Sequence, residues 1–157
     1  VYKRQGQTVK DAGLYIDAET ADLAARRSMG HPYMVQLVGY YMWRSAVRRN
    51  SQVIERCDVE DGHADAVSEF YEAVDAPLYY GLRSPQRLFI EAMAADGGKP
   101  TRMADIIERC ERTQSWASKY RASLIRERII EAAGYGLVRF TVPMLGAYIR
   151  DRVLWHE

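Results

Sequence analysis

The segment from Ser115 to Arg128 is the part of this chain whose residue types are best suited to a charged partner. It holds four basic residues and one acidic residue, whereas the whole 157-residue chain has 22 basic and 21 acidic residues. At about 100° per residue, a helix over this segment has an apolar face formed by Trp116, Ala117, Tyr120 and Leu124. The opposite face contains Ser118, Lys119, Ala122 and Arg126, with Ile125 at its edge.

This second face predicts contact with double-stranded DNA. Its small side chains allow a close approach, and its cations could meet phosphates. Arg121 and Arg139 could add contacts to the DNA backbone, and Ser115 is expected to cap the helix. The residues expected at the DNA are therefore Ser115, Ser118, Lys119, Arg121, Ala122, Arg126 and Arg139. The other interpretation is that the cations only solvate an exposed helix.

No motif in the sequence predicts catalysis. Gly97-Gly98-Lys99 is followed by Pro100 and lacks the upstream glycine of a phosphate-binding loop. The three histidines and two cysteines are scattered, so their spacing forms no zinc-binding pair. The chain starts at Val1 without an obvious start of a fold, so we expect a piece of a longer protein. We expect no catalytic residue, no metal site and no cofactor within this piece.

One acidic group has a superficial likeness to a metal cluster: Asp58, Glu60, Asp61 and Asp65. The helical spacing of these residues predicts instead a solvated first turn, which the helix dipole favours. Asp58 is expected to cap this helix, with Asp61 at the capping-box position. His63 lies on the apolar stripe of the same helix, where we expect a residue at the edge of the core.

Apolar periodicity, capping residues and prolines predict three helices in the first half of the chain, at residues 17–30, 32–47 and 58–74. Residues 1–83 carry 10 basic and 12 acidic residues, whereas residues 84–157 carry 12 basic and 9 acidic residues. Two prolines and a glycine accompany this change, between Ala76 and Pro85. We therefore expect a small helical bundle at residues 1–83 and a second domain at residues 84–157.

The second half has a more specific order of elements. Three helices are expected to begin at Ser84, Thr101 and Ser115, which are their predicted capping residues. Two β-rich runs follow, at residues 128–132 and 137–142, around a turn that contains two glycines. A last helix is expected to begin at Pro143. This order predicts a winged helix-turn-helix domain with one β-hairpin, so the whole chain is expected to be mainly α.

The overall composition bears on partners and location. A formal net charge of +1 selects neither nucleic acid nor an anionic membrane. The longest dense apolar stretch, residues 32–43, holds twelve residues, whereas a membrane helix needs about 18 or more. Two cysteines are too few for a disulfide scaffold. No secretory signal is visible. We expect a cytoplasmic protein without a membrane partner.

Two pieces of the sequence resemble a known family. Residues 31–39, His31-Pro32-Tyr33-Met34-Val35-Gln36-Leu37-Val38-Gly39, follow an alanine-rich helix that ends in arginines. They are similar to the lid of bacterial AAA+ ATPases, where a Gly-x-Pro-[aromatic]-x-x-Gln pattern opens a helix. Residues 84–89 and 115–125 resemble the winged-helix region that follows this lid. The similar ATPases are of the origin-recognition-like and signal-transduction types, and the resemblance covers about residues 17–155.

This resemblance carries implications for nucleotide. In these families a nucleotide-binding domain with the phosphate loop precedes the lid, which implies ATP and Mg²⁺ in the full-length protein. Origin-type ATPases often place a sensor arginine just after the glycine that opens the lid helix, and the matching position here is Tyr33. Arg26 or Arg27 could substitute from the preceding helix. The nucleotide-side residues implied are therefore Arg26, Arg27 and Tyr33, with Tyr33 expected to pack in the core or beside adenine.

The leading hypothesis is a non-catalytic regulatory fragment of an AAA+-type ATP-binding protein, with a winged helix that binds DNA or a partner. The alternative is a protein-interaction module that packs on its own upstream ATPase domain or on an effector, without touching nucleic acid. The near-neutral charge and Glu127 among the cations favour this alternative. A free-standing transcription factor is a third, less favoured hypothesis.

Overall fold

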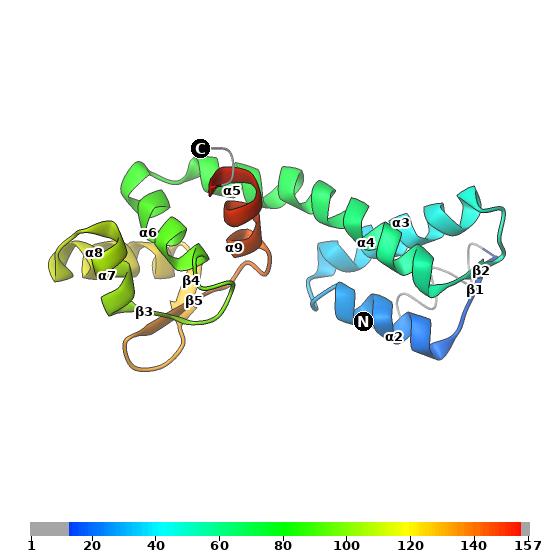
Figure 1. Cartoon of the computed structure of the whole chain (residues 1–157), viewed down its shortest axis with the longest axis horizontal. Helices are drawn as coiled ribbons and strands as arrows, with labels where there is room; N and C mark the ends of the chain where they lie inside the picture. The colour runs from blue at the N-terminus through cyan, green and yellow to red at the C-terminus, as the bar shows by residue number, and fades with distance from the viewer. Residues whose placement is uncertain (1–12, 155–157) are drawn as a thin grey trace. The chain divides into compact units, whose positions relative to one another are not determined.

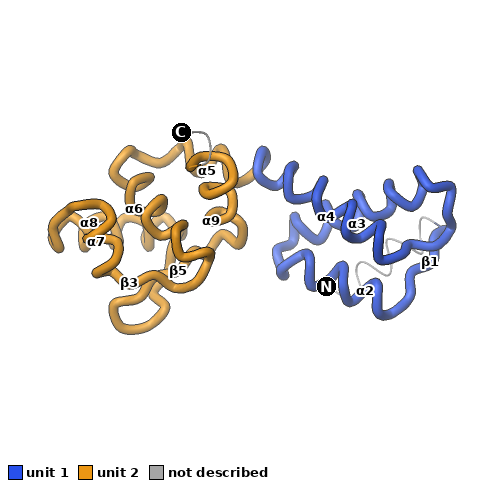
Figure 2. Tube along the Cα trace, viewed as in Figure 1, with its two compact units in different colours: residues 1–73 blue, residues 74–157 orange. Residues whose placement is uncertain are grey.

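Helices form most of the computed structural model, which describes residues 13–154 (Figure 1). The chain divides into two units, residues 1–73 and 74–157 (Figure 2). Unit 1 contains, in chain order, β1 (Tyr15–Ile16), α2 (Ala18–Arg27), α3 (Pro32–Arg48), β2 (Val53–Ile54), α4 (Arg56–Phe70) and most of the π-helical turn η1 (Tyr71–Asp75). Unit 2 contains α5 (Ala76–Gly81), α6 (Ser84–Ala94), β3 (Thr101–Arg102), α7 (Met103–Cys110), α8 (Gln114–Arg126), β4 (Ile130–Ala132), β5 (Leu137–Phe140), α9 (Leu145–Tyr148) and the π-helical turn η2 (Ile149–Val153). The predicted mainly α fold is confirmed.

The first two helices of unit 1 begin where the sequence predicts. The Asp17 carboxylate accepts a hydrogen bond from the Thr20 backbone N–H at 2.7 Å, which caps α2. Helix α3 begins at Pro32, where the missing N–H costs nothing because the first N–H groups of a helix have no partner within it.

Helices α3 and α4 pack closely in unit 1. A Cβ atom added at Gly62 of α4 would lie 2.5 Å from the backbone nitrogen of Met42 in α3, so only glycine permits this approach. Large side chains fully buried in unit 1 include Met34, Met42, Ile54 and Phe70. None of the helices within residues 13–154 combines the length and hydropathy that crossing a membrane requires.

Two very short strands in unit 1 do not appear in the sequence-based prediction. β1 and β2 pair in parallel, with Tyr15 opposite Val53 and Ile16 opposite Ile54. Each strand has two residues, which is too short for an alternating pattern to be recognised.

The start of α4 differs from the prediction. The N-cap is Glu55, and Asp58 is the third helical residue, whose side chain accepts from the Glu55 backbone N–H at 2.8 Å. The predicted pairing of Asp58 as cap with Asp61 is therefore wrong. The sequence also predicts a solvated Asp58, which is wrong. Asp58 is fully buried, because Arg49 at the end of α3 binds its carboxylate.

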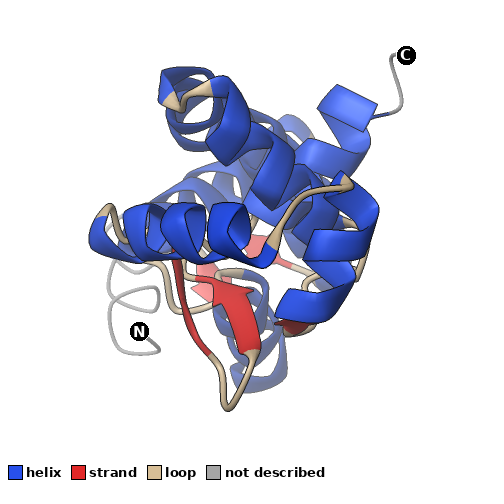
Figure 3. Cartoon of the chain, turned by 90° about the vertical axis from the view of Figure 1, so that its left-hand side faces the viewer, coloured by secondary structure: helices blue, strands red, loops and turns tan. Residues whose placement is uncertain are grey.

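Unit 2 has the order of elements predicted for a winged helix-turn-helix domain. Helices α6, α7 and α8 are followed by the hairpin of β4 and β5, in which Ile130 lies opposite Phe140 and Ala132 opposite Val138. A third strand, β3, pairs antiparallel with β5, which gives the strand order β3-β5-β4. The turn of the β4–β5 hairpin projects beyond the strands (Figure 3).

Several predicted helix caps in unit 2 are displaced by one to two residues. Arg83 and not Ser84 is the N-cap of α6, and Thr113 and not Ser115 is the N-cap of α8. Thr101, the predicted cap of the second helix, lies in β3, and Arg102 is the N-cap of α7. The last helical segment starts at Leu145, two residues after Pro143.

The division between the units falls before the composition change near residue 83. It lies between residues 73 and 74, so α5 belongs to unit 2. Pro77 does not prevent a helix from forming here, because it lies in the first turn of α5, where proline is tolerated.

Candidate nucleic-acid interface

Helix α8 buries the apolar face that the sequence predicts. Ala117 and Leu124 are fully buried, and Trp116 and Tyr120 are half-buried. The Trp116 ring lies 6.2 Å from that of Phe89 in α6 and 5.0 Å from that of Tyr120, between ring centroids. These contacts fix which side of α8 faces the core of unit 2, and they leave the opposite side to solvent.

The outward side of α8 holds most of the residues predicted at DNA. The exposed ones are Ser115, Ser118, Lys119, Ala122 and Arg126, while Arg121 is half-buried. Within residues 13–154, no carboxylate forms an ion pair with Lys119, Arg121 or Arg126. This side therefore presents positive charge that has no ion-pair partner among residues 13–154.

Two other arginines of unit 2, at or within α7, are neutralised within the unit. Arg102 pairs with Asp105 at 2.8 Å, and Arg109 pairs with Asp96 at 2.7 Å. Charge on α7 is therefore balanced locally, which sets α8 apart from its neighbouring helix.

Lys119 rests on an aromatic ring of its own helix. Its Nζ atom lies 5.4 Å from the centroid of the Tyr120 ring. A cation over a ring face is attracted by the quadrupole of the ring. The Tyr120 ring therefore holds the ammonium group close to the surface of α8.

The single acidic residue near the end of α8 is held by two other residues. Glu127 Oε1 accepts hydrogen bonds from Gln86 Nε2 at 2.8 Å and from Ser123 Oγ at 3.1 Å. Gln86 is buried, donates also to Ser123 Oγ at 3.0 Å and accepts from the Arg83 backbone N–H at 3.0 Å. This network ties the start of α6 to the end of α8. Gln86 is absent from the residues predicted from the sequence, although its position three residues after an N-cap is a usable signal.

Arg139 lies on the hairpin and not on α8. Its Nε atom donates to Glu131 Oε1 at 2.6 Å across the β4–β5 ladder, and both side chains are exposed. The predicted contact of Arg139 with a phosphate stays a prediction, and in this arrangement a phosphate would compete with Glu131.

The residues predicted at nucleotide all have carboxylate partners in unit 1. Arg26 pairs with Asp22, and Arg27 pairs with Glu60 at 2.8 Å. The Tyr33 hydroxyl donates to Glu69 Oε1 at 3.3 Å, and partial burial followed by the Glu69 charge raises the pKa of Tyr33. A nucleotide role for these three residues stays a prediction.

His63 occupies the core-edge position that the sequence predicts. It is half-buried on α4, and burial, followed by the charge of Arg27, lowers its pKa. The imidazole is therefore biased toward its neutral form.

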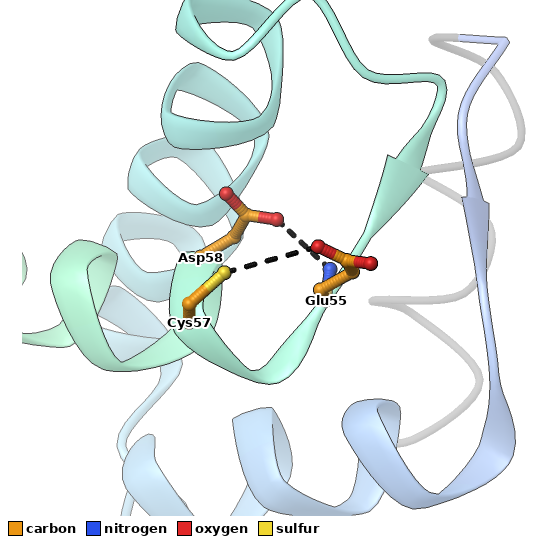
Figure 4. A group of neighbouring side chains, drawn as sticks. All are labelled: Glu55, Cys57 and Asp58. Atoms are coloured by element: carbon orange, nitrogen blue, oxygen red, sulfur yellow. Dashed lines mark hydrogen bonds between the residues drawn. The ribbon is translucent and has the colours of Figure 1, made fainter.

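Three side chains at the start of α4 lie close enough together to suggest a metal site (Figure 4). Glu55, Cys57 and Asp58 place their ligand atoms within 4.8 Å of one another. Arg49 already binds both carboxylates, at 2.9 Å from Glu55 and 2.5 Å from Asp58. Burial alone would raise the pKa of Asp58, but hydrogen bonds from Arg49 and from the Glu55 N–H lower it below its usual value. Helix capping and an ion pair explain this group.

The turn of the hairpin carries an exposed residue that is absent from the predicted interface. Tyr135 is fully exposed between Gly134 and Gly136. The two glycines were interpreted as a turn signal only, and an aromatic residue at a turn was the signal that could have identified it.

One family model matches most of unit 2, and several solved structures align with nearly the whole chain. A family model described as a domain of unknown function (DUF8462) matches residues 76–149. No curated protein matches the chain. Similar solved structures are those of RuvB from Thermotoga maritima, described as a Holliday junction branch migration motor, and of two of its mutants, each at 12% identity and a TM-score of 0.43. The alignments cover 91%, 91% and 97% of this chain and 45%, 46% and 48% of those chains. The chain thus spans about half the length of the structures that it matches.

Proposed function

We propose that unit 2 binds double-stranded DNA through the outward side of α8, as a non-catalytic regulatory part of an AAA+-type ATP-binding protein. The observation that carries the DNA part is the set of cations on α8, Lys119, Arg121 and Arg126, which form no ion pair with a described carboxylate. The AAA+ part rests on the lid-like and winged-helix-like sequence segments described above.

The geometry of α8 supports this reading physically. In helix-turn-helix proteins the corresponding helix enters the major groove. Ser118 and Ala122 lie between the cations and have short side chains, so the backbone of α8 can approach a groove closely. The aromatic packing on the inward side and the Gln86 network at the end of the helix hold α8 in place, which limits the entropy lost on binding.

The proposal places nucleotide binding outside these 157 residues, in a longer protein of which this chain would be one part. Each of Arg26, Arg27 and Tyr33 already binds a carboxylate of unit 1, so this arrangement by itself does not fit a phosphate site. ATP and Mg²⁺ would be held by an upstream ATPase domain, with unit 1 as its lid, in a cytoplasmic protein. Measurable ATP hydrolysis by the purified 157 residues would contradict the non-catalytic assignment.

Charge reversal tests the DNA interface. The variant with Lys119→Glu and Arg126→Glu is expected to lose at least tenfold in affinity for a labelled duplex, measured by fluorescence anisotropy at low salt. A control with the same charge change, Lys99→Glu with Arg152→Glu, alters exposed cations outside α8 and is expected to bind nearly as the unchanged chain does. Equal affinity of the α8 variant and the unchanged chain would reject the proposal.

A protein-interaction module is the second candidate. The pairing of Arg139 with Glu131 favours this candidate, because the positive charge of Arg139 is then already neutralised and does not attract a phosphate. This candidate predicts no duplex affinity even at low salt, together with retention of a purified upstream ATPase domain on the immobilised chain.

A further inference from the structure

Tyr135 at the tip of the β4–β5 hairpin is the most exposed large hydrophobic residue of the described chain, with a relative exposure of 106%. Single exposed apolar side chains are common on protein surfaces, so exposure alone says little. What distinguishes Tyr135 is how firmly the backbone beneath it is held and how little charge surrounds it.

Three backbone hydrogen bonds hold the tip of the hairpin. The Ala133 N–H donates to the Leu137 carbonyl at 3.0 Å, and the Leu137 N–H donates to the Gly134 carbonyl at 3.3 Å. The N–H of Met103, the first residue of α7, donates to the Gly136 carbonyl at 2.8 Å. These bonds join the turn both to the hairpin ladder and to the helical part of unit 2.

The two glycines beside Tyr135 make this turn possible. Gly134 has φ of +126° and Gly136 has φ of +67°, conformations that residues with a Cβ atom rarely adopt. The tip therefore presents one aromatic ring on a constrained turn. The backbone of the tip therefore loses little conformational entropy when the ring binds.

The chemistry of the tip selects the partner. Residues 133–136 carry no charge, and the nearest charged residues of the hairpin, Glu131 and Arg139, neutralise each other. Arg102, which lies on β3 opposite Leu137, is paired with Asp105. The tip thus offers no attraction for phosphates, only a phenol ring with two faces. An aromatic face stacks well on a nucleobase whose own face is open. In a continuous duplex the neighbouring base pairs cover these faces, whereas a gap leaves some of them open.

We propose that Tyr135 stacks on an exposed base where a DNA duplex is interrupted next to the segment bound by α8. This inference rests on the proposed DNA binding and names the DNA form that the same unit prefers. Helix α8 supplies charge-driven affinity for any duplex, and Tyr135 adds affinity only where a base is unstacked. The ligand class is therefore gapped duplex DNA.

Two DNAs with the same stem sequence and the same two hairpin loops test the inference by fluorescence anisotropy. One is a closed dumbbell with an uninterrupted duplex stem, and the other has a short single-stranded gap in one strand of that stem, so the unpaired loop bases are common to both and only the gap differs. We expect the unchanged chain to bind the gapped DNA about tenfold more tightly, because base–aromatic stacking is worth about that factor or more.

Three variants separate stacking from other effects. Tyr135→Ala is expected to remove the preference and to leave the affinity for the uninterrupted dumbbell unchanged, whereas Tyr135→Phe should keep the preference. Tyr80→Ala removes another exposed tyrosine of unit 2 and is expected to change neither affinity. Circular dichroism of each variant verifies the fold.

Two results would overturn the inference while sparing the proposed function: equal binding of both DNAs by the unchanged chain, or equal weakening of both by Tyr135→Ala. Failure of the chain to bind either DNA would reject the proposed function and this inference together. If the α8 charge-reversal variant binds the uninterrupted dumbbell as well as the unchanged chain does, the α8 interface is rejected, and the inference is rejected with it because it places the open base next to α8.

Discussion

The Nε2 atom of Gln86 donates a hydrogen bond to Oε1 of Glu127 at 2.8 Å, across 41 positions of sequence. The contact joins the first turn of α6 to the residue that follows α8, and Ser123 of α8 shares it. It has two consequences for the candidate interface. The end of α8 is positioned by a buried side chain, and a negative charge next to Arg126 is held by hydrogen bonds to Gln86 and Ser123.

Gln86→Leu is expected to destabilise unit 2 by about 1–3 kcal/mol, because the Arg83 N–H and the Glu127 carboxylate lose a partner. Urea unfolding followed by circular dichroism measures the change. Gln114→Leu alters an exposed glutamine at the start of α8 and is expected to change stability by no more than about 0.5 kcal/mol. Equal effects of the two substitutions would show that the network contributes nothing.

Gly62→Ala tests the close approach of α3 and α4. The added Cβ would lie 2.5 Å from Met42 N, so the helices must separate, at a cost of about 1–3 kcal/mol. Gly39→Ala is the matched control, because Gly39 lies inside α3 with nothing within 4 Å of the new atom. It is expected to stabilise α3 by up to about 1 kcal/mol, since alanine has the higher helix propensity. Thermal unfolding of the two variants should therefore shift in opposite directions.

Much of the fold follows from local sequence patterns. The inward face of α8 was predictable because Ala117 and Leu124 obey the helical period and both are buried. The hairpin was predictable from Gly134 and Gly136 between two β-rich runs. Pro32 marked the start of α3 because proline suits the first helical position.

Contacts between distant residues explain what local patterns missed. β1 exists only because it pairs with β2, some forty residues later in the chain. Asp58 was interpreted as solvated, and the approach of Arg49 that buries its carboxylate is a tertiary contact. The Arg139–Glu131 pair was within reach of the sequence, since residues opposite each other in a hairpin are expected to pair.

That pair leads to a prediction at the hairpin. Glu131→Gln removes the partner charge of Arg139 and should strengthen duplex binding about twofold to fivefold at low salt. The reason is that Arg139, once free of its carboxylate partner, can attract a phosphate. Arg139→Gln should weaken it by less than twofold, since the arginine is already neutralised. Anisotropy titrations of both variants measure the two effects. A larger loss from Arg139→Gln than gain from Glu131→Gln would contradict this description of the hairpin.

Asp75 gives a pH dependence of stability. Its carboxylate is fully buried, neither oxygen has a hydrogen-bond partner among the described residues, and burial raises its pKa from 3.8 to about 7. The Asp75 proton is bound more tightly in the folded state than in the unfolded state. The stability that this proton contributes is therefore fully present below pH 4 and is lost as the pH rises to about 7. The loss is at most about 4 kcal/mol, since each pKa unit corresponds to about 1.4 kcal/mol.

Asp75→Asn should therefore flatten this decline, and the variant should be more stable than the unchanged chain at pH 8. Urea unfolding at pH 5 and pH 8 measures the difference in slope. Parallel pH profiles for the two proteins would show that Asp75 is not responsible.

The salt dependence of duplex affinity tests the central claim, that Lys119, Arg121 and Arg126 on α8 contact DNA phosphates. Each phosphate contact lowers the logarithm of the association constant by about 0.9 per decade of salt, so three contacts predict a slope of about −2.7. The variant with Lys119→Gln and Arg126→Gln should have a slope of about −0.9. A slope that these two substitutions leave unchanged, or the absence of duplex binding at low salt, would contradict the claim.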